Sequence, residues 1–276
     1  MPAVTVDIPT SLKIALDKEI ARVGGDASAV ITSALAEFLG TPVHTLFQIS
    51  TSGALVAGVY SRAVSVAKIL DHGDFGLGTF AELDGEMVVL DGRVYRVQGS
   101  GRVSEVDPGA GVPFAVVTRF TPQINLEAGP FATLADLQAQ CDSLRISGNI
   151  FYAFRLDGRF SSIRSRAVNP PDKGVRLADA AKSQSEFHFN NIDGTLVGLW
   201  SPGFSSAFSV AGYHFHFISE DRQHGGHLLD CAAAKLQLRI EALADFHLAL
   251  PETESFLKAN LSENTPEELA YAEHAH

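Results

Sequence analysis

Four of the ten histidines fall within fourteen residues, in the segment GYHFHFISEDRQHGGHLLDC. His214 and His216 are two residues apart in an aromatic run typical of a β-strand, where alternate side chains point to the same side. Two imidazoles on one side of a strand suit zinc and similar ions. His227 begins a second apolar run after an expected turn that carries Gly225-Gly226. A hairpin would bring this third imidazole to the first two, and three neutral imidazoles leave open positions on a metal for substrate or water.

Two alternatives compete for the third ligand. His224 precedes His227 by three residues, although His227 opens the apolar run and is better placed to point inward. In HFHFISE, Glu220 follows the histidine pair at the spacing used in cupins, so a cupin-like metal enzyme would use the pair with Glu220. A cupin also needs a downstream histidine motif, and His247 in ADFHLALPE fits that motif poorly.

Hairpins and a few helices must position these side chains. Asp-Gly between alternating apolar residues predicts a hairpin turn, and the chain has four such pairs: Asp84-Gly85, Asp91-Gly92, Asp157-Gly158 and Asp193-Gly194. Apolar patterning predicts helices over Ser52 to Leu70 and Thr133 to Leu144, with short pieces near Glu254–Leu261 and Pro266–Ala275. The mixture predicts a β-rich α/β body over residues 44–276, with large, mostly antiparallel sheets.

The first 40 residues have a different pattern. Val4, Val6 and Ile8 alternate with polar residues and predict a short strand that ends at Pro9. Apolar residues then recur at helical spacing in two stretches, and Asp26 is the expected N-cap of the second helix. Such a short unit cannot bury its own apolar surface. It resembles a ribbon-helix-helix unit, in which two copies pair their strands.

The charge of this segment bears on its role. It has three basic and five acidic residues, a net charge of −2. An acidic face opposes contact with phosphates, so a DNA-binding regulator is disfavoured. We interpret residues 1–40 as an oligomerisation segment, with docking on the body as the alternative.

The composition of the whole chain excludes several classes of function. The net charge is −11, so a basic footprint for nucleic acid is missing and an anionic substrate would need a local cation. We expect neither a membrane-spanning helix nor a signal peptide, because no apolar stretch approaches the roughly 20 residues of a span and MPAVTVDIPT has no basic n-region or apolar h-region. The two cysteines, Cys141 and Cys231, are interpreted as buried thiols. The fold then does not depend on a disulfide and is compatible with the reducing cytoplasm.

Three separated segments carry a family resemblance. HGDFGLGTFAELDGEMVVLDG, FYAFRLDGRFSSIRSRAV and the histidine segment resemble, in this order, the bacterial acetolactate decarboxylases. The resemblance runs from about Thr45 to Glu273 and leaves residues 1–40 outside. It implies a two-domain α/β body with a zinc ion held by His214, His216 and His227 in its C-terminal part.

The resemblance also implies two glutamates near the metal. One lies in DGEMV and corresponds to Glu86, which would otherwise be read as a solvated hairpin carboxylate. The other lies near the C-terminus, where ELAYAEHAH offers Glu268 and Glu273. Glu273 is preferred, and Glu267 is a weaker alternative.

An arginine and a threonine complete the implied site. Arg166 is assigned over Arg164 in SIRSRAV because it directly precedes the Ala-Val pair. A planar, permanently charged guanidinium suits a carboxylate substrate. Thr79, in GLGTF, corresponds to a threonine that contacts the substrate.

The activity implied by the resemblance is decarboxylation of (S)-2-acetolactate to (R)-acetoin and CO2. Zinc would stabilise an enediolate intermediate, Arg166 would orient the carboxylate, and Glu86 or Glu273 would supply a proton. We expect a cytoplasmic homodimer or larger homo-oligomer.

Overall fold

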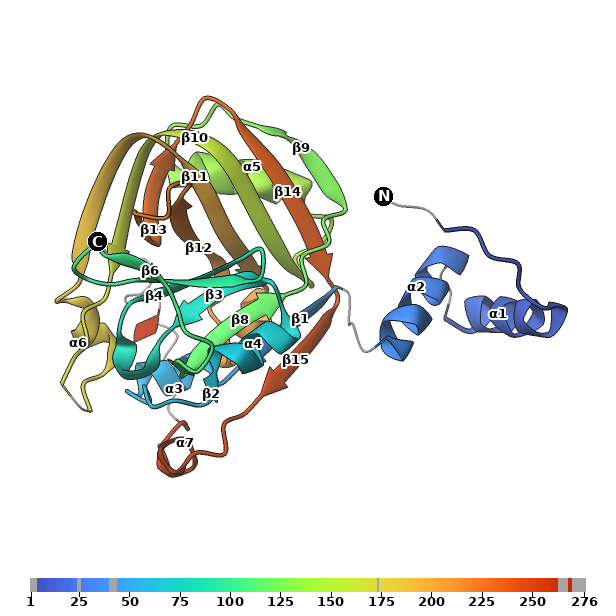
Figure 1. Ribbon diagram of the computed structural model, residues 1–276, viewed down its shortest axis with the longest axis horizontal. Coiled ribbons are helices and arrows are strands. Elements are labelled where there is room, and N and C mark those ends of the chain that lie inside the picture. Colours follow the sequence, from blue (N-terminus) through green and yellow to red (C-terminus); the bar gives the residue numbers. More distant parts are fainter. Residues whose placement is uncertain (1–3, 24–25, 40–43, 173, 263–267, 270–276) are drawn as a thin grey trace. The chain divides into compact units, whose positions relative to one another are not determined.

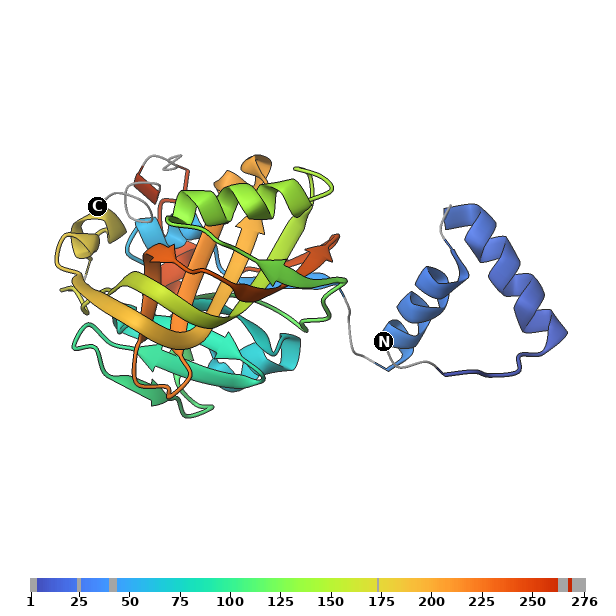
Figure 2. The same cartoon turned by 90° about the horizontal axis from the view of Figure 1, so that it is seen from above.

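A computed structural model describes residues 4–23, 26–39, 44–172, 174–262 and 268–269. Its contacts divide the chain into two units, Met1–Val43 and His44–His276. Figures 1 and 2 show both units in two views. None of the described helices has the length and apolar character needed to cross a bilayer.

The first unit contains the helices α1 (Thr10–Val23) and α2 (Ala27–Phe38). Asp26 caps α2 as expected, since its side chain accepts the Ala29 N–H at 2.7 Å. The strand expected over Val4 to Ile8 does not form, and this prediction is wrong for the single chain. A strand needs a neighbour for its N–H and C=O groups, and the described part of the chain offers these residues none.

The second unit contains a sheet of seven strands in which only the β15–β1 pair is parallel. In spatial order its strands are β15 (Asp245–Ala249), β1 (Thr45–Ile49), β8 (Phe114–Thr118), β3 (Phe75–Thr79), β4 (Glu86–Leu90), β5 (Arg93–Val97) and β6 (Val103–Glu105). The β4–β5 turn confirms one hairpin prediction. Asp91 and Gly92 both have positive φ, 52° and 74°, as a type I′ turn requires.

A six-stranded antiparallel sheet faces the first one. Its strands in spatial order are β11 (Ser185–Ser201), β12 (Gly212–Ser219), β13 (Gly225–Ala232), β10 (Phe151–Ala167), β14 (Leu236–Leu243) and β9 (Ile124–Ala128). The strands β10 and β11 also pair directly as one long hairpin. A small ladder joins β2 (Val64–Ser65) to β7 (Gly111–Val112).

Helices cover the sheets and their connections (Figures 1 and 2). They are α3 (Ser52–Val56), α4 (Val66–His72), α5 (Leu134–Leu144), α6 (Leu177–Ala181), α7 (Glu254–Lys258) and the 3₁₀ turns η1 (Ala81–Leu83) and η2 (Gly203–Ala207). The helix expected up to Leu144 is confirmed, and Thr133 caps it in a capping box. The single helix expected over Ser52 to Leu70 is wrong: Gly58, at φ 83°, follows the first short helix and β2 precedes the second.

Alternation along the strands divides the core into layers. On β4, Val88 and Leu90 join the apolar cluster between the two sheets, whereas Met87 and Val89 join the cluster on the other face. Figure 2 shows α5 on the outer side of the six-stranded sheet, over a third cluster. Both sheets belong to the same compact unit.

Two of the four Asp-Gly predictions are wrong. Asp157-Gly158 and Asp193-Gly194 lie inside β10 and β11, where Gly158 pairs with Gly194. Tertiary partners outweigh the turn preference here. Asp157 accepts hydrogen bonds from Arg155, Arg239 at 2.6 Å and Thr195 at 2.8 Å.

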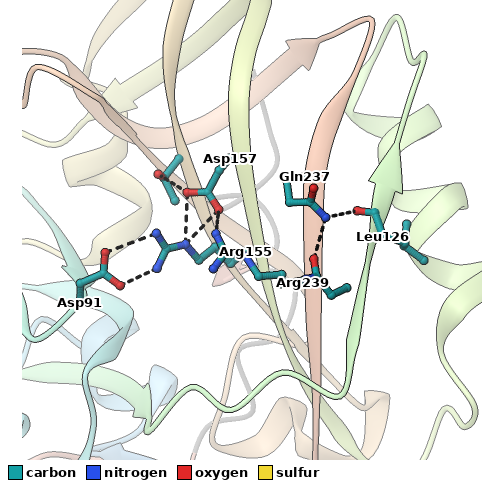
Figure 3. Close-up of polar contacts among 8 residues, drawn as sticks. Asp91, Leu126, Arg155, Asp157, Gln237 and Arg239 are labelled. Atoms are coloured by element: carbon teal, nitrogen blue, oxygen red, sulfur yellow. Dashed lines mark hydrogen bonds and ion pairs between the residues drawn. The ribbon is translucent and has the colours of Figure 1, made fainter. Parts of the chain in front are cut away.

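The Asp157 network also joins the two sheets. Figure 3 shows Arg155, on β10, between Asp157 and Asp91. Asp91 lies in the β4–β5 turn of the other sheet, 2.5 Å from the Arg155 guanidinium. The same view includes Gln237 on β14, which donates to the Leu126 carbonyl of β9 at 2.9 Å.

Candidate metal centre and active site

The three predicted histidines meet on one face of the β12–β13 hairpin. On β12, His214 and His216 alternate with Phe215 and Phe217, which are buried in the cluster under α5. The antiparallel register places His216 opposite His227 on β13. The hairpin expected between the two apolar runs is therefore confirmed.

The imidazole nitrogens converge on one point. His214 Nε2 lies 3.1 Å from His216 Nε2 and 3.2 Å from His227 Nδ1. Two ligands of a tetrahedral zinc ion, each roughly 2.0–2.1 Å from the metal, are about 3.3 Å apart. The spacing of these nitrogens and their chemistry fit a divalent ion with three imidazole ligands. Among the described residues, this is the group of side chains that could hold a metal.

A backbone carbonyl orients the central imidazole. His216 Nδ1 lies 2.7 Å from the Met87 carbonyl oxygen on β4. A carbonyl oxygen only accepts, so Nδ1 carries the proton and Nε2 keeps the lone pair that points toward the other imidazoles. The seven-stranded sheet thus sets the tautomer of a histidine on the six-stranded sheet.

Close packing of β13 against β10 requires a glycine beside the cluster. Gly226 has φ 135°, and a Cβ there would lie 2.5 Å from the Arg166 carbonyl oxygen. The sequence suggested that Gly225-Gly226 forms the turn of the hairpin. The structure instead places both glycines at the start of β13, where Gly226 allows the strand to approach β10.

Three further predicted residues line the same cavity as the histidines. It has a volume of about 40 Å³ and includes Thr79, Glu86 and Arg166 in its wall. Thr79 and Glu86 are cross-strand partners on β3 and β4, and both are buried. The Thr79 hydroxyl donates to the Gly85 carbonyl at 2.9 Å. The cavity therefore lies between the two sheets, and both contribute to it.

Glu86 is not the solvated hairpin carboxylate that its local sequence suggests. It is 7% exposed, and its Oε1 accepts the Val168 N–H at 3.3 Å. Its Oε2 lies 3.7 Å from His216 Nε2. The carboxyl group thus faces the imidazole cluster across the cavity.

The structure separates the two candidate arginines. Arg166 is 4% exposed, lines the cavity, and donates through Nη1 to Gln184 Oε1. Arg164 lies 3.8 Å from Glu186 and lines a different hollow, beside Thr133. Arg166 is therefore the guanidinium beside the imidazoles.

Several other candidates lie elsewhere. Glu220 and His224 are exposed in the β12–β13 connection, so the cupin-like alternative, with Glu220 beside the histidine pair, is wrong. Glu268 pairs with Arg176 instead of lining the cavity. Glu273 and Glu267 lie outside the described residues, as does most of the short helix expected over Pro266–Ala275.

Sequence reasoning missed the groups that hold the site in place. They include the Met87 carbonyl, the Val168 N–H and Gln184, together with the apolar side chains that close the cavity: Leu55, Leu83, Phe114, Val168, Leu177 and Ala181. Backbone groups leave no signal in a sequence. Gln184 lies 18 residues from Arg166 along the chain, and nothing local marks it as a partner.

The arrangement has the composition of a catalytic site. Three imidazoles, a carboxyl group, a guanidinium and a threonine hydroxyl meet in a small cavity that is otherwise lined by apolar side chains. The chain matches the alpha-acetolactate decarboxylase family over residues 46–263. It belongs to this family of carboxy-lyases.

Individual relatives agree with the family match. The chain is 38% identical to the alpha-acetolactate decarboxylase of Bacillus subtilis strain 168 over 221 residues, which are 80% of this chain and 87% of that protein. It is 40% identical to the Methanosarcina mazei alpha-acetolactate decarboxylase over 229 residues, 83% and 80% of the two chains. The crystal structure of the B. subtilis enzyme superimposes with a TM-score of 0.81 at 35% identity, covering 83% of this chain and 99% of that one.

Proposed function

We propose that this chain decarboxylates (S)-2-acetolactate to (R)-acetoin and CO2. The observation that carries the proposal is the single cavity that joins the three imidazoles to Glu86 and Arg166, in a chain of the acetolactate decarboxylase family. In the reaction, the bond between the α-carbon and the carboxylate breaks. Its electron pair passes to the α-carbon and the adjacent ketone, and a proton then binds the former α-carbon to give acetoin.

The cofactor that we propose is zinc, held by His214, His216 and His227. When bound, it would supply a Lewis acid for the ketone and hydroxyl oxygens of the substrate. The nitrogen spacing of 3.1 and 3.2 Å supports this ligand set. The Met87 carbonyl supports it further, because it keeps His216 Nε2 available as a lone-pair donor.

Arg166 binds and orients the substrate carboxylate in this proposal. The protein has a net charge of −11, so its surface repels an anion at long range. A buried guanidinium inside the cavity supplies the local positive charge. Gln184 accepts a hydrogen bond from Nη1 of Arg166 and so restricts the orientation of the planar guanidinium.

Glu86 delivers the proton to the former α-carbon. Its carboxyl group is buried and faces the imidazoles. The Val168 N–H holds Oε1, so the side chain approaches the reacting carbon from one side only. Protonation from a fixed side sets the configuration of the product. Thr79, beside Glu86 in the β3–β4 ladder, contacts the substrate through its hydroxyl oxygen.

The test is acetoin formation from racemic acetolactate by the purified protein, before and after chelation and after zinc is restored. We expect activity that is lost with the metal and regained with zinc, with one acetolactate enantiomer consumed first. Folded, zinc-loaded protein that makes no acetoin would refute the proposed reaction. Activity that survives complete metal removal would refute the cofactor.

We propose that residues 1–40 join two copies of the chain. If residues 4–8 of two chains pair antiparallel about Val6, Val4 meets Ile8 of the second copy and Thr5 meets Asp7. The apolar side chains then share one face, and the two Asp7 carboxylates avoid each other. The exposed fractions of 87% for Val4 and 69% for Val6 support an unfilled apolar face. Docking of this face on the body is the competing outcome.

We also propose a cytoplasmic location. Both cysteines are buried and free, so the fold does not depend on disulfides and suits a reducing compartment. Immunoblots of fractionated cells test this, and recovery from an extracytoplasmic fraction would contradict it.

A further inference from the structure

The cavity has a wall that belongs to neither sheet. It is α6, which lies in the connection of the long β10–β11 hairpin (Figure 1). Leu177 and Ala181, the first and last residues of α6, line the cavity together with Leu55 of α3. A helix of five residues has little stability of its own. Its position therefore depends on its contacts with other segments.

Glu268 pairs with the N-cap residue of α6, and Leu269 shares an apolar cluster with Leu177. Arg176, the N-cap residue of α6, donates from Nε to Glu268 Oε2 at 3.0 Å and from Nη2 to Glu268 Oε1 at 3.1 Å. This is the parallel, two-bond geometry of a well-formed arginine–carboxylate pair. Leu269 is buried in the apolar cluster that contains Leu177. We call Arg176, Glu268 and Leu269 the C-terminal clamp.

The wall is connected directly to the arginine of the site. After Ala181 the chain continues in tight turns, in which the Ser183 N–H bonds to the Ala180 carbonyl and the Gln184 N–H to the Ala181 carbonyl. Gln184 then accepts from Arg166 Nη1. A shift of α6 thus moves Gln184, and through it the guanidinium. The three histidines lie on β12 and β13, outside this path.

We propose that the C-terminal clamp positions α6 and, through Gln184, the guanidinium of Arg166. Arg176 and Glu268 are positioning residues: they touch neither the imidazoles nor the cavity, and they act on substrate binding through the wall. The proposal rests on the proposed function for its kinetic consequence. Its structural consequence, a change in the mobility of α6, can be measured without any activity assay.

The kinetic test replaces Arg176 by alanine and, separately, Glu268 by glutamine. Both residues are partly exposed, so the body should fold normally in either variant. We expect KM for acetolactate to rise about three- to fivefold. The kcat at saturation and the zinc content should stay within about twofold of the parent, because groups that bind substrate equally in the ground and transition states change KM alone.

Two further variants separate positioning from a general loss of structure. Exchanging the charges, with Arg176→Glu and Glu268→Arg together, should return KM to within about twofold of the parent. Asp179→Asn is the matched control, because it removes the exposed Asp179–Lys182 ion pair of the same helix without involving the chain end. We expect this control to keep the parental KM.

Hydrogen exchange supplies a readout that does not require activity. The amides of Ala180 and Gln184 should exchange faster in Glu268→Gln than in the parent, and at the parental rate in the exchanged pair. Unchanged exchange and an unchanged KM in the single variants would overturn the proposal, as would an exchanged pair no better than either single variant. If the parent protein makes no acetoin, the proposed function fails, and the exchange rates still decide whether the clamp holds α6.

Discussion

The two units of this chain have equally regular apolar patterns but very different degrees of burial. All five residues of β4 in the body are buried, with alternate side chains in two separate clusters. In the first unit neither α1 nor α2 contains a buried residue, and Leu12, Leu35 and Phe38 are exposed. Periodicity along a chain is enough to specify a helix or a strand. Burial needs a second surface, which distant segments supply only in the body.

This difference predicts how substitutions should behave in each unit. Buried side chains in the body are held by several distant segments, so a change at one of them should alter chemistry or stability. Side chains of the first unit have few partners in the single chain, so a change there should alter association alone.

Loss of a histidine from the cluster should have the largest effect. His227→Ala removes one of three imidazoles that converge within hydrogen-bonding distance. We expect zinc content to fall below half and activity to fall at least a hundredfold, because changes to mere supporting groups already cost about 10- to 100-fold. Metal analysis and acetoin assays measure both.

His224→Ala is the matched control for that prediction, since His224 lies in the same segment but is exposed and outside the cluster. It should keep its zinc and its activity. A His227 variant that behaves like the His224 variant would show that the third ligand is misassigned.

Replacing the cavity arginine should have an intermediate effect. Arg166→Lys keeps the charge but removes the planar fork that Gln184 restrains. Hydrogen bonds to charged groups contribute about 1.5–3 kcal/mol, so kcat/KM should fall roughly 10- to 100-fold. Arg164→Lys, two residues earlier and outside the cavity, should keep the parental kcat/KM. Equal losses in the two variants would contradict the assignment.

A small pH-dependent effect is expected at the first residue of the body. His44 Nδ1 lies 2.8 Å from Glu241 Oε1, and this hydrogen bond raises the pKa of His44 above its ordinary value of 6.5 although burial opposes it. Because the pKa of His44 is higher in the folded than in the unfolded protein, the protonated side chain stabilises the fold. This stabilisation is complete at pH values below the unfolded-state pKa of about 6.5. This contribution is lost as pH rises through the raised pKa.

The measurement is thermal unfolding at pH 5.5 and pH 8.5 for the parent and for His44→Gln. The side chain is about a third exposed, so the loss should be only about 0.5 kcal/mol. The parent should lose more stability than the variant between the two pH values. Identical pH dependence in both proteins would rule out this linkage.

Substitutions in the first unit should leave the stability and activity of the body unchanged. Antiparallel pairing about Val6 places this residue opposite itself, so Val6→Cys should form a disulfide-linked dimer under mild oxidation, whereas Thr5→Cys should not. The native thiols should not interfere, because Cys141 and Cys231 are buried and burial raises the pKa of the Cys141 thiol to about 12. Non-reducing gels measure the dimer.

Activity of the reduced Val6→Cys variant should equal that of the parent. A Val6→Cys protein that stays monomeric on the gel, or that cross-links no better than Thr5→Cys, would contradict strand pairing. Docking on the body would then be the better explanation for the apolar face.

Several features of the fold and the site could be predicted from local sequence. The His214–His216 spacing already specifies one face of a strand, and Asp91-Gly92 specifies a tight turn. Thr133 marks the start of α5, and Asp26 the start of α2. In each case the signal lies within a few residues, because strand alternation, turn geometry and helix capping are set by neighbours along the chain.

What the sequence determined by itself was the type of many elements, the histidine cluster and the likeness to a family. The family resemblance named Glu86 and Arg166, but only the tertiary structure showed that Glu86 is buried beside His216 and that Arg166, unlike Arg164, lines the cavity. It alone also placed Asp157-Gly158 within a strand. The physical reason is the same in each case. Burial, ion pairing and the approach of two sheets depend on residues tens of positions apart, and their partners are set by packing, which local spacing does not encode.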